Sequence, residues 1–126
     1  MQKMEALKKE LTKENSLPDK NLEVLLESFY GKMLSDTMLG FFFQGKDLKH
    51  IVEQQKSLLM MVMGFKKTYE GKPVNQAHQN LPPILPGHFD RRLVLLKETL
   101  QENNISLKAQ EEWLSFENQF RNVIVK

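Results

Sequence analysis

The sequence predicts an all-α fold, and three of its features lead to that class. Apolar residues recur three and four positions apart through most of the chain, the spacing that places side chains on one face of a helix. Prolines mark the boundaries of several of these segments. No segment shows the alternation of apolar and polar residues that is typical of a half-buried strand. We therefore expect helices joined by short loops.

The helical segments are bounded by residues that commonly start or stop helices. Pro73 suits the first turn of a short helix, Pro82–Pro83 stop that helix, and Ser106 is a good cap for the last one. Residues 37–45 are long enough only for a turn of helix or a corner. The predicted helices, in order, cover residues 4–14, 18–36, 46–64, 73–81, 87–103 and 106 to the C-terminus.

Composition predicts one domain that works without cysteine chemistry. A chain of 126 residues is long enough for one hydrophobic core and too short for two. Because it contains no cysteine, disulfides, thiolate metal sites, iron–sulfur clusters and cysteine nucleophiles are excluded. We expect a single domain over residues 1–126, in which residues 1–17 form a loosely attached N-terminal helix and loop.

Charge and hydropathy do not favour nucleic acid or a membrane as a partner. The 18 basic and 16 acidic residues are interleaved along the chain. The longest apolar run, Leu58–Gly64, is far shorter than the roughly 20 residues that cross a bilayer. Residues 1–13 also lack the apolar core of a signal peptide. We expect a soluble, cytoplasmic protein that binds neither nucleic acid nor a membrane.

Three polar side chains lie in the apolar stripes of three different helices: Tyr30, Gln55 and His78. Each has an ordinary explanation taken alone. The tyrosine can be an apolar wall with its hydroxyl bound to the backbone, the glutamine can reach water at the edge of its stripe, and the histidine can be satisfied by a carbonyl in the core. Three such placements in one small core instead suggest an enclosed polar cavity.

Two further features lie close to these stripes. Phe41–Phe43 are three consecutive aromatic residues that cannot all face one core, so at least one of them should cover a ligand or a second helix; ordinary packing is the alternative. Arg92 interrupts an apolar stripe, where an arginine usually lays its stem on apolar surface and keeps its charge in water. A histidine facing a tyrosine and a glutamine across aromatic walls is chemically suited to haem.

The sequence resembles the truncated haemoglobins, a short form of the globin fold, from about Leu22 to Val125. The order and spacing of several short motifs carry this resemblance. These motifs are Phe29-Tyr30, Leu39-Gly40 with Phe43 thirteen residues after Tyr30, Gln55, Tyr69-Glu70-Gly71 nine residues before His78, Leu81-Pro82-Pro83-Ile84 and His88-Phe89-Asp90. They combine features of two subgroups of the family.

The resemblance implies a two-over-two helical sandwich around haem b and its iron. It makes His78 the proximal iron ligand and Tyr30 and Gln55 the donors on the distal side, where Ile51 would gate access. Gln54 and His50 would lie near the haem propionates, and Phe43 would stack on the porphyrin. The remaining residues expected to line the cofactor are Leu48, Leu58, Val74, Leu81, Phe89 and Arg92.

The chain departs from the family pattern at Arg92, where the family places an apolar residue or a tryptophan. If Arg92 enters the pocket, it could bind an anion or a haem propionate. Family members in which a distal histidine binds the iron also exist, and His50 is the only candidate for that role in this sequence.

Three functions are consistent with these features. The first is a haem protein for reversible binding and transport of oxygen and related ligands, nitric oxide and carbon monoxide, with a nitric oxide dioxygenase activity that needs an external reductase. The second is a haem-based sensor or redox protein closed by His50. The third is a haem-free helical interaction module in which Tyr30, Gln55 and His78 satisfy one another.

Overall fold

The structure is a computed structural model that describes residues 4–66 and 83–125, and all the elements in these ranges are helical. The elements are α1 (Glu5–Leu11), the 3₁₀ turn η1 (Lys13–Asn15), α2 (Pro18–Ser35), the 3₁₀ turn η2 (Gly40–Phe43), α3 (Leu48–Val62), α5 (Pro86–Glu102), α6 (Leu107–Asn118) and α7 (Arg121–Ile124). Pairing of extended backbone within the described ranges is limited to one isolated bridge between Ile84 and Val125. The prediction of an all-α fold is confirmed, whereas the predicted helix at 73–81 lies outside the described residues.

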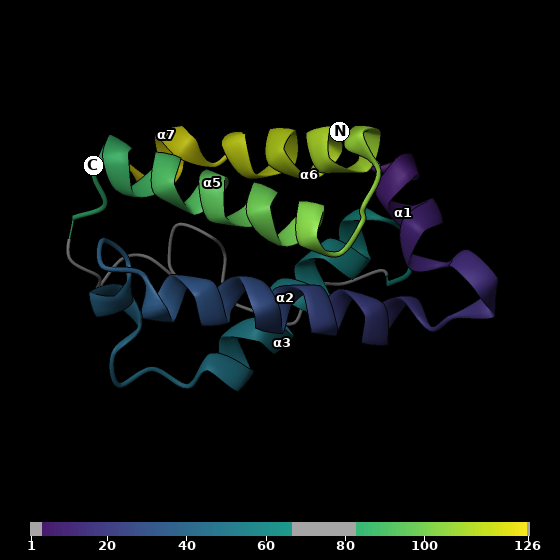
Figure 1. Ribbon diagram of the computed structural model, residues 1–126, viewed down its shortest axis with the longest axis horizontal. Coiled ribbons are helices and arrows are strands. Elements are labelled where there is room, and N and C mark those ends of the chain that lie inside the picture. Colours follow the sequence, from purple (N-terminus) through teal and green to yellow (C-terminus); the bar gives the residue numbers. More distant parts are fainter. Residues whose placement is uncertain (1–3, 67–82, 126) are drawn as a thin grey trace.

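The helices form two layers, with α2 and α3 below α5 and α6 in the view of Figure 1. Helix α2 contacts α3 within its own layer and α5 in the other layer, while α6 packs on α5. The short helix α1 lies at one end, against α6 and α2. This is the two-over-two arrangement that the resemblance implies.

Local capping explains where several helices begin and end. The hydroxyl of Ser106 accepts a hydrogen bond from the backbone N–H of Ala109, as predicted for a cap, and the carboxylate of Asp47 accepts one from His50 N–H at the start of α3. At the end of α2, the Asp36 carboxylate accepts bonds from the N–H groups of Met38 and Leu39. Asp36 thereby turns the chain into η2.

The predicted last helix is divided in two. After α6, the N–H groups of Gln119 and Phe120 bond to carbonyls three residues earlier, at Phe116 and Glu117. These shorter bonds tighten the turn and break the regular helix before α7 begins. Periodicity did not indicate the break, because apolar residues continue at helical spacing on both sides of it.

From Met4 onward, the described part of the N-terminal segment packs against the core. Met4, Leu7 and Leu11 are at most 1% exposed and belong to the main hydrophobic cluster. Two backbone N–H groups at the start of α1, those of Ala6 and Leu7, donate to the Glu112 carboxylate at 3.2 and 3.0 Å. Helix α1 is therefore fixed by apolar burial and by hydrogen bonds to α6.

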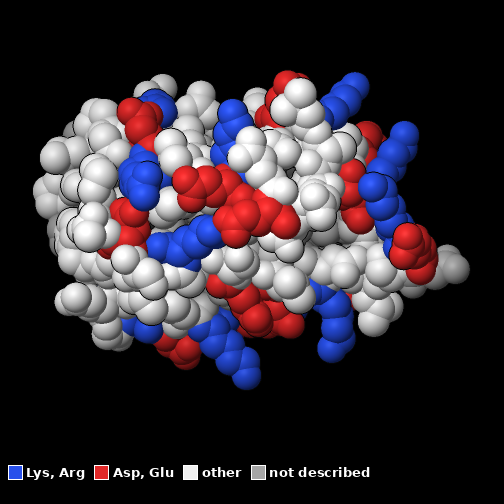
Figure 2. Space-filling view, in the orientation of Figure 1, with Lys and Arg blue, Asp and Glu red and all other residues white. Residues whose placement is uncertain are grey.

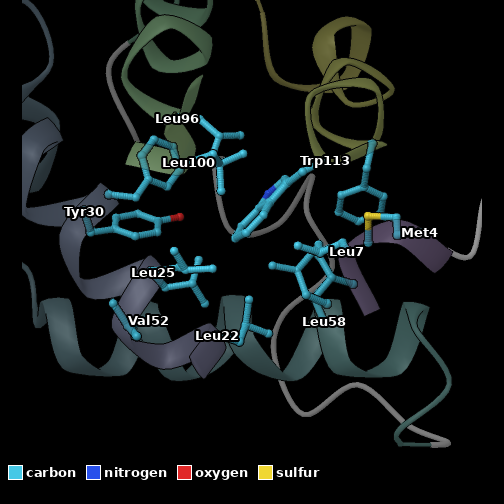
Figure 3. Packing of buried hydrophobic residues seen from close by; sticks show 14 of the residues in the cluster. Met4, Leu7, Leu22, Leu25, Tyr30, Val52, Leu58, Leu96, Leu100 and Trp113 are labelled. Atoms are coloured by element: carbon cyan, nitrogen blue, oxygen red, sulfur yellow. The ribbon is translucent and has the colours of Figure 1, made fainter. Parts of the chain in front are cut away.

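The hydrophobic core lies between the layers and is densest near α1. Figure 3 shows Trp113 between Leu7 on one side and Leu96 and Leu100 on the other, and the indole is fully buried. Tyr30 lies at the edge of the same cluster, with its hydroxyl oxygen directed toward the interior of the molecule. The core thus ends at a polar group on the side away from α1.

The surface and the helix lengths agree with the composition. On the face shown in Figure 2, acidic and basic side chains are interleaved rather than gathered into areas of one sign. Among the residues described, none of the helices is both long enough and apolar enough to span a bilayer.

Candidate functional site

A cavity of about 240 Å³ lies at the end of the sandwich away from α1. Its walls come from the second half of α2, from η2, α3 and the first half of α5, and from the chain around α6 and α7. The described residues that line it are Tyr30, Met33, Leu39, Phe42, Phe43, Lys46, Ile51, Gln54, Gln55, Leu58, Ile84, His88, Phe89, Arg92, Phe116, Glu117, Phe120 and Ile124. Most of these side chains are apolar, and the polar ones include tyrosine, glutamine, arginine and glutamate.

Eight of the residues predicted from sequence meet in this cavity, although they come from four elements. They are Tyr30, Phe43, Ile51, Gln54, Gln55, Leu58, Phe89 and Arg92. Helical spacing explains why these α3 residues line the cavity, because Ile51, Gln55 and Leu58 are four and three residues apart and share one face. The cavity therefore brings Tyr30 and Gln55 together, as the stripes suggested.

Two predicted residues lie elsewhere. His50 is exposed, and its ring nitrogen Nε2 is 3.0 Å from the side-chain nitrogen of Gln54. Leu48 is half-buried and lines a separate surface groove between α2 and α3. Both lie in the first turn of α3, and His50 directly precedes Ile51, so the helix turns it about 100° away from the face that Ile51 presents. Val74, Leu81 and His78 lie outside the described residues.

Tyr30 is held rigidly at the cavity wall. It is 3% exposed, and its ring stands edge-on to the ring of Phe43, with centroids 5.7 Å apart. Burial raises the pKa of its hydroxyl above the ordinary value, although the nearby charge of Arg92 acts in the opposite direction. The phenol is therefore neutral at physiological pH and retains its hydrogen.

Arg92 enters the cavity instead of extending its head into water. Its Nε and one terminal nitrogen, Nη2, each lie 3.1 Å from the same carboxylate oxygen of Glu117. Nη2 also lies 3.4 Å from the Tyr30 hydroxyl, and Nη1 lies 3.6 Å from the sulfur of Met33. The guanidinium carbon is 4.9 Å from the ring centre of Phe29. Burial disfavours the charge, but Glu117 and Tyr30 more than compensate and raise the pKa, so Arg92 remains a cation.

Glu117 is the main cavity residue that sequence reasoning missed. It is buried, and its second carboxylate oxygen accepts a hydrogen bond from the indole N–H of Trp113 at 3.3 Å. A glutamate directly after Phe116 and four residues after Trp113 lies on an apolar face, and this was the available signal. The pattern could not reveal its partner, because Arg92 belongs to another helix.

His88 also lines the cavity, and a backbone hydrogen bond fixes the tautomer of its neutral ring. Its Nδ1 accepts a hydrogen bond from the N–H of Leu85 at 3.0 Å. In the neutral ring the hydrogen must then be on Nε2. The edges of Phe41 and Phe42 pack on the ring, with centroids 5.9 and 5.1 Å away. His88 therefore presents an N–H donor rather than a free lone pair.

The corner that carries Phe42 and Phe43 depends on a close approach of two backbones. A β-carbon at Gly40 would lie 2.5 Å from the carbonyl oxygen of Leu34, which is far inside van der Waals contact. Glycine permits this approach because it has no side chain. Together with the Asp36 cap, Gly40 holds η2 against the end of α2 and so positions one wall of the cavity.

Sequence comparison places the chain among known haemoglobins. The sequence model of the bacterial-like globin family matches residues 18–126. Group 1 truncated hemoglobin of Tetrahymena pyriformis is 35% identical over 80 residues, and that of Tetrahymena thermophila is 32% identical over 78 residues. Each match covers 62% of this chain and 64% of the relative, so it spans slightly less than two thirds of the relative's length.

Solved structures show the same fold. The truncated hemoglobin of Tetrahymena pyriformis in its Fe(III) form superposes with a TM-score of 0.80 at 24% identity, over 99% of this chain and 98% of that one. The 2/2 hemoglobin of Synechococcus sp. PCC 7002, in the cyanomet state and with covalently attached heme, gives a TM-score of 0.76 at 28% identity. That superposition covers 85% of this chain and 91% of the other.

Proposed function

This chain belongs to the bacterial-like globin family, as a truncated haemoglobin, and from that premise we propose that it holds haem b in the cavity and reversibly binds oxygen there. Binding of diatomic ligands through haem follows from the family. The preference for oxygen is our proposal, and the observation that carries it is the neutral Tyr30 hydroxyl, buried in the cavity that Gln55 also lines.

The cavity has the chemistry that haem requires. The porphyrin is flat and largely apolar, and Phe43, Leu58 and Phe89 provide apolar and aromatic walls. Its two propionates are negatively charged, and Lys46 and the Nε2–H of His88 are donors that line the same cavity. These residues would hold the group by burial of its ring and by hydrogen bonds to its carboxylates.

The hydrogen-bonding states of the histidines support His78 as the axial ligand. An imidazole binds iron through a nitrogen that carries a lone pair. His88 uses Nδ1 to accept the Leu85 N–H, which leaves its hydrogen on Nε2, and His50 is exposed and paired with Gln54. Of the three histidines in the chain, His78 is therefore the proposed ligand.

When bound, haem would supply a ferrous iron for diatomic ligands, of which oxygen would carry the most negative charge. The protein's contribution is to supply hydrogen-bond donors and to exclude water. Tyr30 donates from its hydroxyl and Gln55 from its amide, while Phe43 shields the ligand from solvent. Each such bond contributes about 1–1.5 kcal/mol, or roughly tenfold in affinity. Carbon monoxide accumulates less charge, so it gains less from the same donors.

Haem titration followed by stopped-flow kinetics tests this proposal. The purified protein should develop a Soret band with one haem per chain, and His78→Ala should abolish it. His50→Ala is the matched control and should bind haem normally, with unchanged coordination. Tyr30→Phe should retain haem and release oxygen about tenfold faster.

Each outcome discriminates among the three functions. Absence of a Soret band would support the haem-free module. A six-coordinate ferrous spectrum that becomes five-coordinate in His50→Ala would support the sensor. An unchanged oxygen release rate in Tyr30→Phe would refute the role of this tyrosine as a donor.

We also propose that the oxygenated protein converts nitric oxide to nitrate. The cavity is lined by apolar side chains such as Ile51, Leu58 and Phe89, which suit the entry of a small apolar gas molecule. Nitric oxide, oxygen and one electron together make nitrate, so turnover requires an external reductase, which we expect in the cytoplasm. Mixing oxygenated protein with nitric oxide should yield one nitrate per haem, whereas recovery of nitric oxide unchanged would contradict the activity.

A further inference from the structure

We propose that the ion pair between the half-buried Arg92 and the buried Glu117 is a positioning device for Tyr30, which commits the tyrosine hydroxyl to donating its hydrogen into the cavity. The site would in this way favour ligands that accumulate negative charge over ligands that do not. This inference rests on the proposed haem-based function, and it assigns the selectivity of that site to two residues that do not themselves need to touch the ligand.

The hydrogen bond between Arg92 and Tyr30 can have only one direction. An arginine side chain has five N–H donors and no acceptor, so where Nη2 of Arg92 meets the Tyr30 oxygen, the tyrosine must accept. The hydrogen of the hydroxyl is then left for another acceptor. Among the described residues, Tyr30 makes no other hydrogen bond, and its side chain lines the cavity. A ligand in the cavity is therefore the acceptor toward which this hydrogen can turn.

Glu117 holds the arginine in the orientation that this requires. One of its oxygens accepts a hydrogen bond from Nε of Arg92 and lies 3.1 Å from Nη2, and the other accepts from the indole N–H of Trp113. The indole is fully buried, so the carboxylate is anchored to the hydrophobic core. A chain of contacts therefore runs from Trp113 through Glu117 and Arg92 to Tyr30, across α6, α5 and α2.

The pair is better suited to orienting a donor than to binding an anion. The carboxylate of Glu117 is 8% exposed and neutralises the guanidinium, so the cavity gains little net positive charge. The positive end of the pair nevertheless faces Tyr30. Burial raises the pKa of the hydroxyl, and Arg92 opposes that rise while Glu117 adds to it, so the hydroxyl keeps its hydrogen and can donate it.

The test is a double-mutant cycle on ligand release from the haem-loaded protein. Arg92→Met together with Glu117→Gln removes both charges at similar volume and so avoids leaving one charge buried alone. This double variant should release oxygen about three- to tenfold faster and carbon monoxide at less than twice the original rate. In a Tyr30→Phe background, the same double change should have no further effect, because the group it positions is gone.

A conservative variant covers the case in which the double variant does not fold. Arg92→Lys keeps the positive charge beside Glu117, but a single ammonium lacks the planar fork that bridges Glu117 and Tyr30. We expect oxygen release to accelerate at least about threefold, while carbon monoxide release stays the same. Lys32→Met is the matched control, because Lys32 pairs with Glu102 between α2 and α5 outside the cavity, and it should leave both rates unchanged.

The infrared stretching frequency of bound carbon monoxide gives a reading that general loosening of the fold would not reproduce. A donor aimed at the ligand lowers this frequency, so Tyr30→Phe and the Arg92/Glu117 double variant should raise it by the same amount. The proposal is overturned if Arg92→Lys keeps the original oxygen rate, or if the double change accelerates release equally with and without the Tyr30 hydroxyl. If Tyr30→Phe itself has no effect, it is the donor role in the proposed function that fails.

Discussion

Glu112 and Glu117 are two buried carboxylates on the same helix, and they serve opposite ends of the molecule. Both are less than 10% exposed. Glu112 accepts hydrogen bonds from two backbone N–H groups of α1, at the end filled by the apolar core. Glu117 accepts bonds from the side chains of Arg92 and Trp113, at the end that holds the cavity.

The difference shows what each end is built to do. Backbone donors belong to a helix terminus that needs acceptors in any case, so Glu112 contributes chiefly to holding α1 in place. Glu117 instead pairs with the side chain of Arg92, and this places a positive charge beside the Tyr30 hydroxyl. We expect changes at the α1 end to alter stability alone, and changes at the cavity end to alter stability and ligand binding together.

The largest effect should come from breaking the ion pair on one side only. Arg92→Met leaves the Glu117 charge buried without its cation, which costs about 3–5 kcal/mol of folding free energy. Adding Glu117→Gln should recover much of this loss. Urea unfolding followed by circular dichroism measures the folding free energy of both variants. If Arg92→Met were as stable as the double variant, the charge of Glu117 would be stabilised by groups other than Arg92.

A smaller effect is expected from two matched glycine substitutions. Gly40→Ala forces η2 away from the Leu34 carbonyl, which should cost about 1–3 kcal/mol and weaken haem retention, because Phe42 and Phe43 move with it. Gly31→Ala in α2 meets no atom within 4 Å and should stabilise the helix by about 0.5–1 kcal/mol. Measurements of thermal unfolding and of haem dissociation compare the two variants. Equal effects would argue against the close approach of Gly40 to the Leu34 carbonyl.

At the α1 end, Glu112→Gln keeps the shape of the side chain but removes the charge that strengthens its bonds to Ala6 and Leu7. We expect a loss of about 1–2 kcal/mol in folding free energy. Oxygen release should be unchanged, which stopped-flow measurement can check. A faster release would mean that the two ends are coupled through α6.

The smallest expected effect is on how stability depends on pH, through Asp36 at the end of α2. The hydrogen bond from Arg91 holds the pKa of the Asp36 carboxyl below its ordinary value. Because that pKa is lower in the folded state, the interaction stabilises the protein above the ordinary aspartate pKa of about 4 and is lost as pH falls through the folded value. Asp36→Asn should therefore flatten the fall in melting temperature below about pH 4, and parallel curves for the two proteins would contradict this.

Much of the fold could be predicted because helical periodicity is a local property of the sequence. The stripe of α2 placed Tyr30 on the inner face, and the stripe of α3 placed Gln55 there. Arg92 was visible as a charge that interrupts an apolar stripe. Its structural position then showed that it enters the cavity instead of reaching water.

The remainder depends on pairings between helices, which periodicity does not describe. Glu117 bonds to Trp113 one turn earlier on its own helix, but its charged partner Arg92 belongs to another helix, so periodicity could not identify it as part of the site. The N-terminal segment was predicted to be loosely attached because its charged residues were visible, whereas the backbone donors that Glu112 accepts from were not. His50 was expected near the haem propionates, at the margin of the apolar face, and the structure places it on the exposed side of α3 beside Gln54.

Hydrogen exchange with and without haem tests most directly the division between the two ends. If haem and its ligands occupy the cavity, binding should slow amide exchange in residues 30–58, 84–92 and 116–124, which form the described cavity walls. Exchange in residues 5–26 and 96–113, around α1 and Trp113, should change little, because that core is already closed. Protection spread evenly over both ends, or concentrated near α1, would contradict the account.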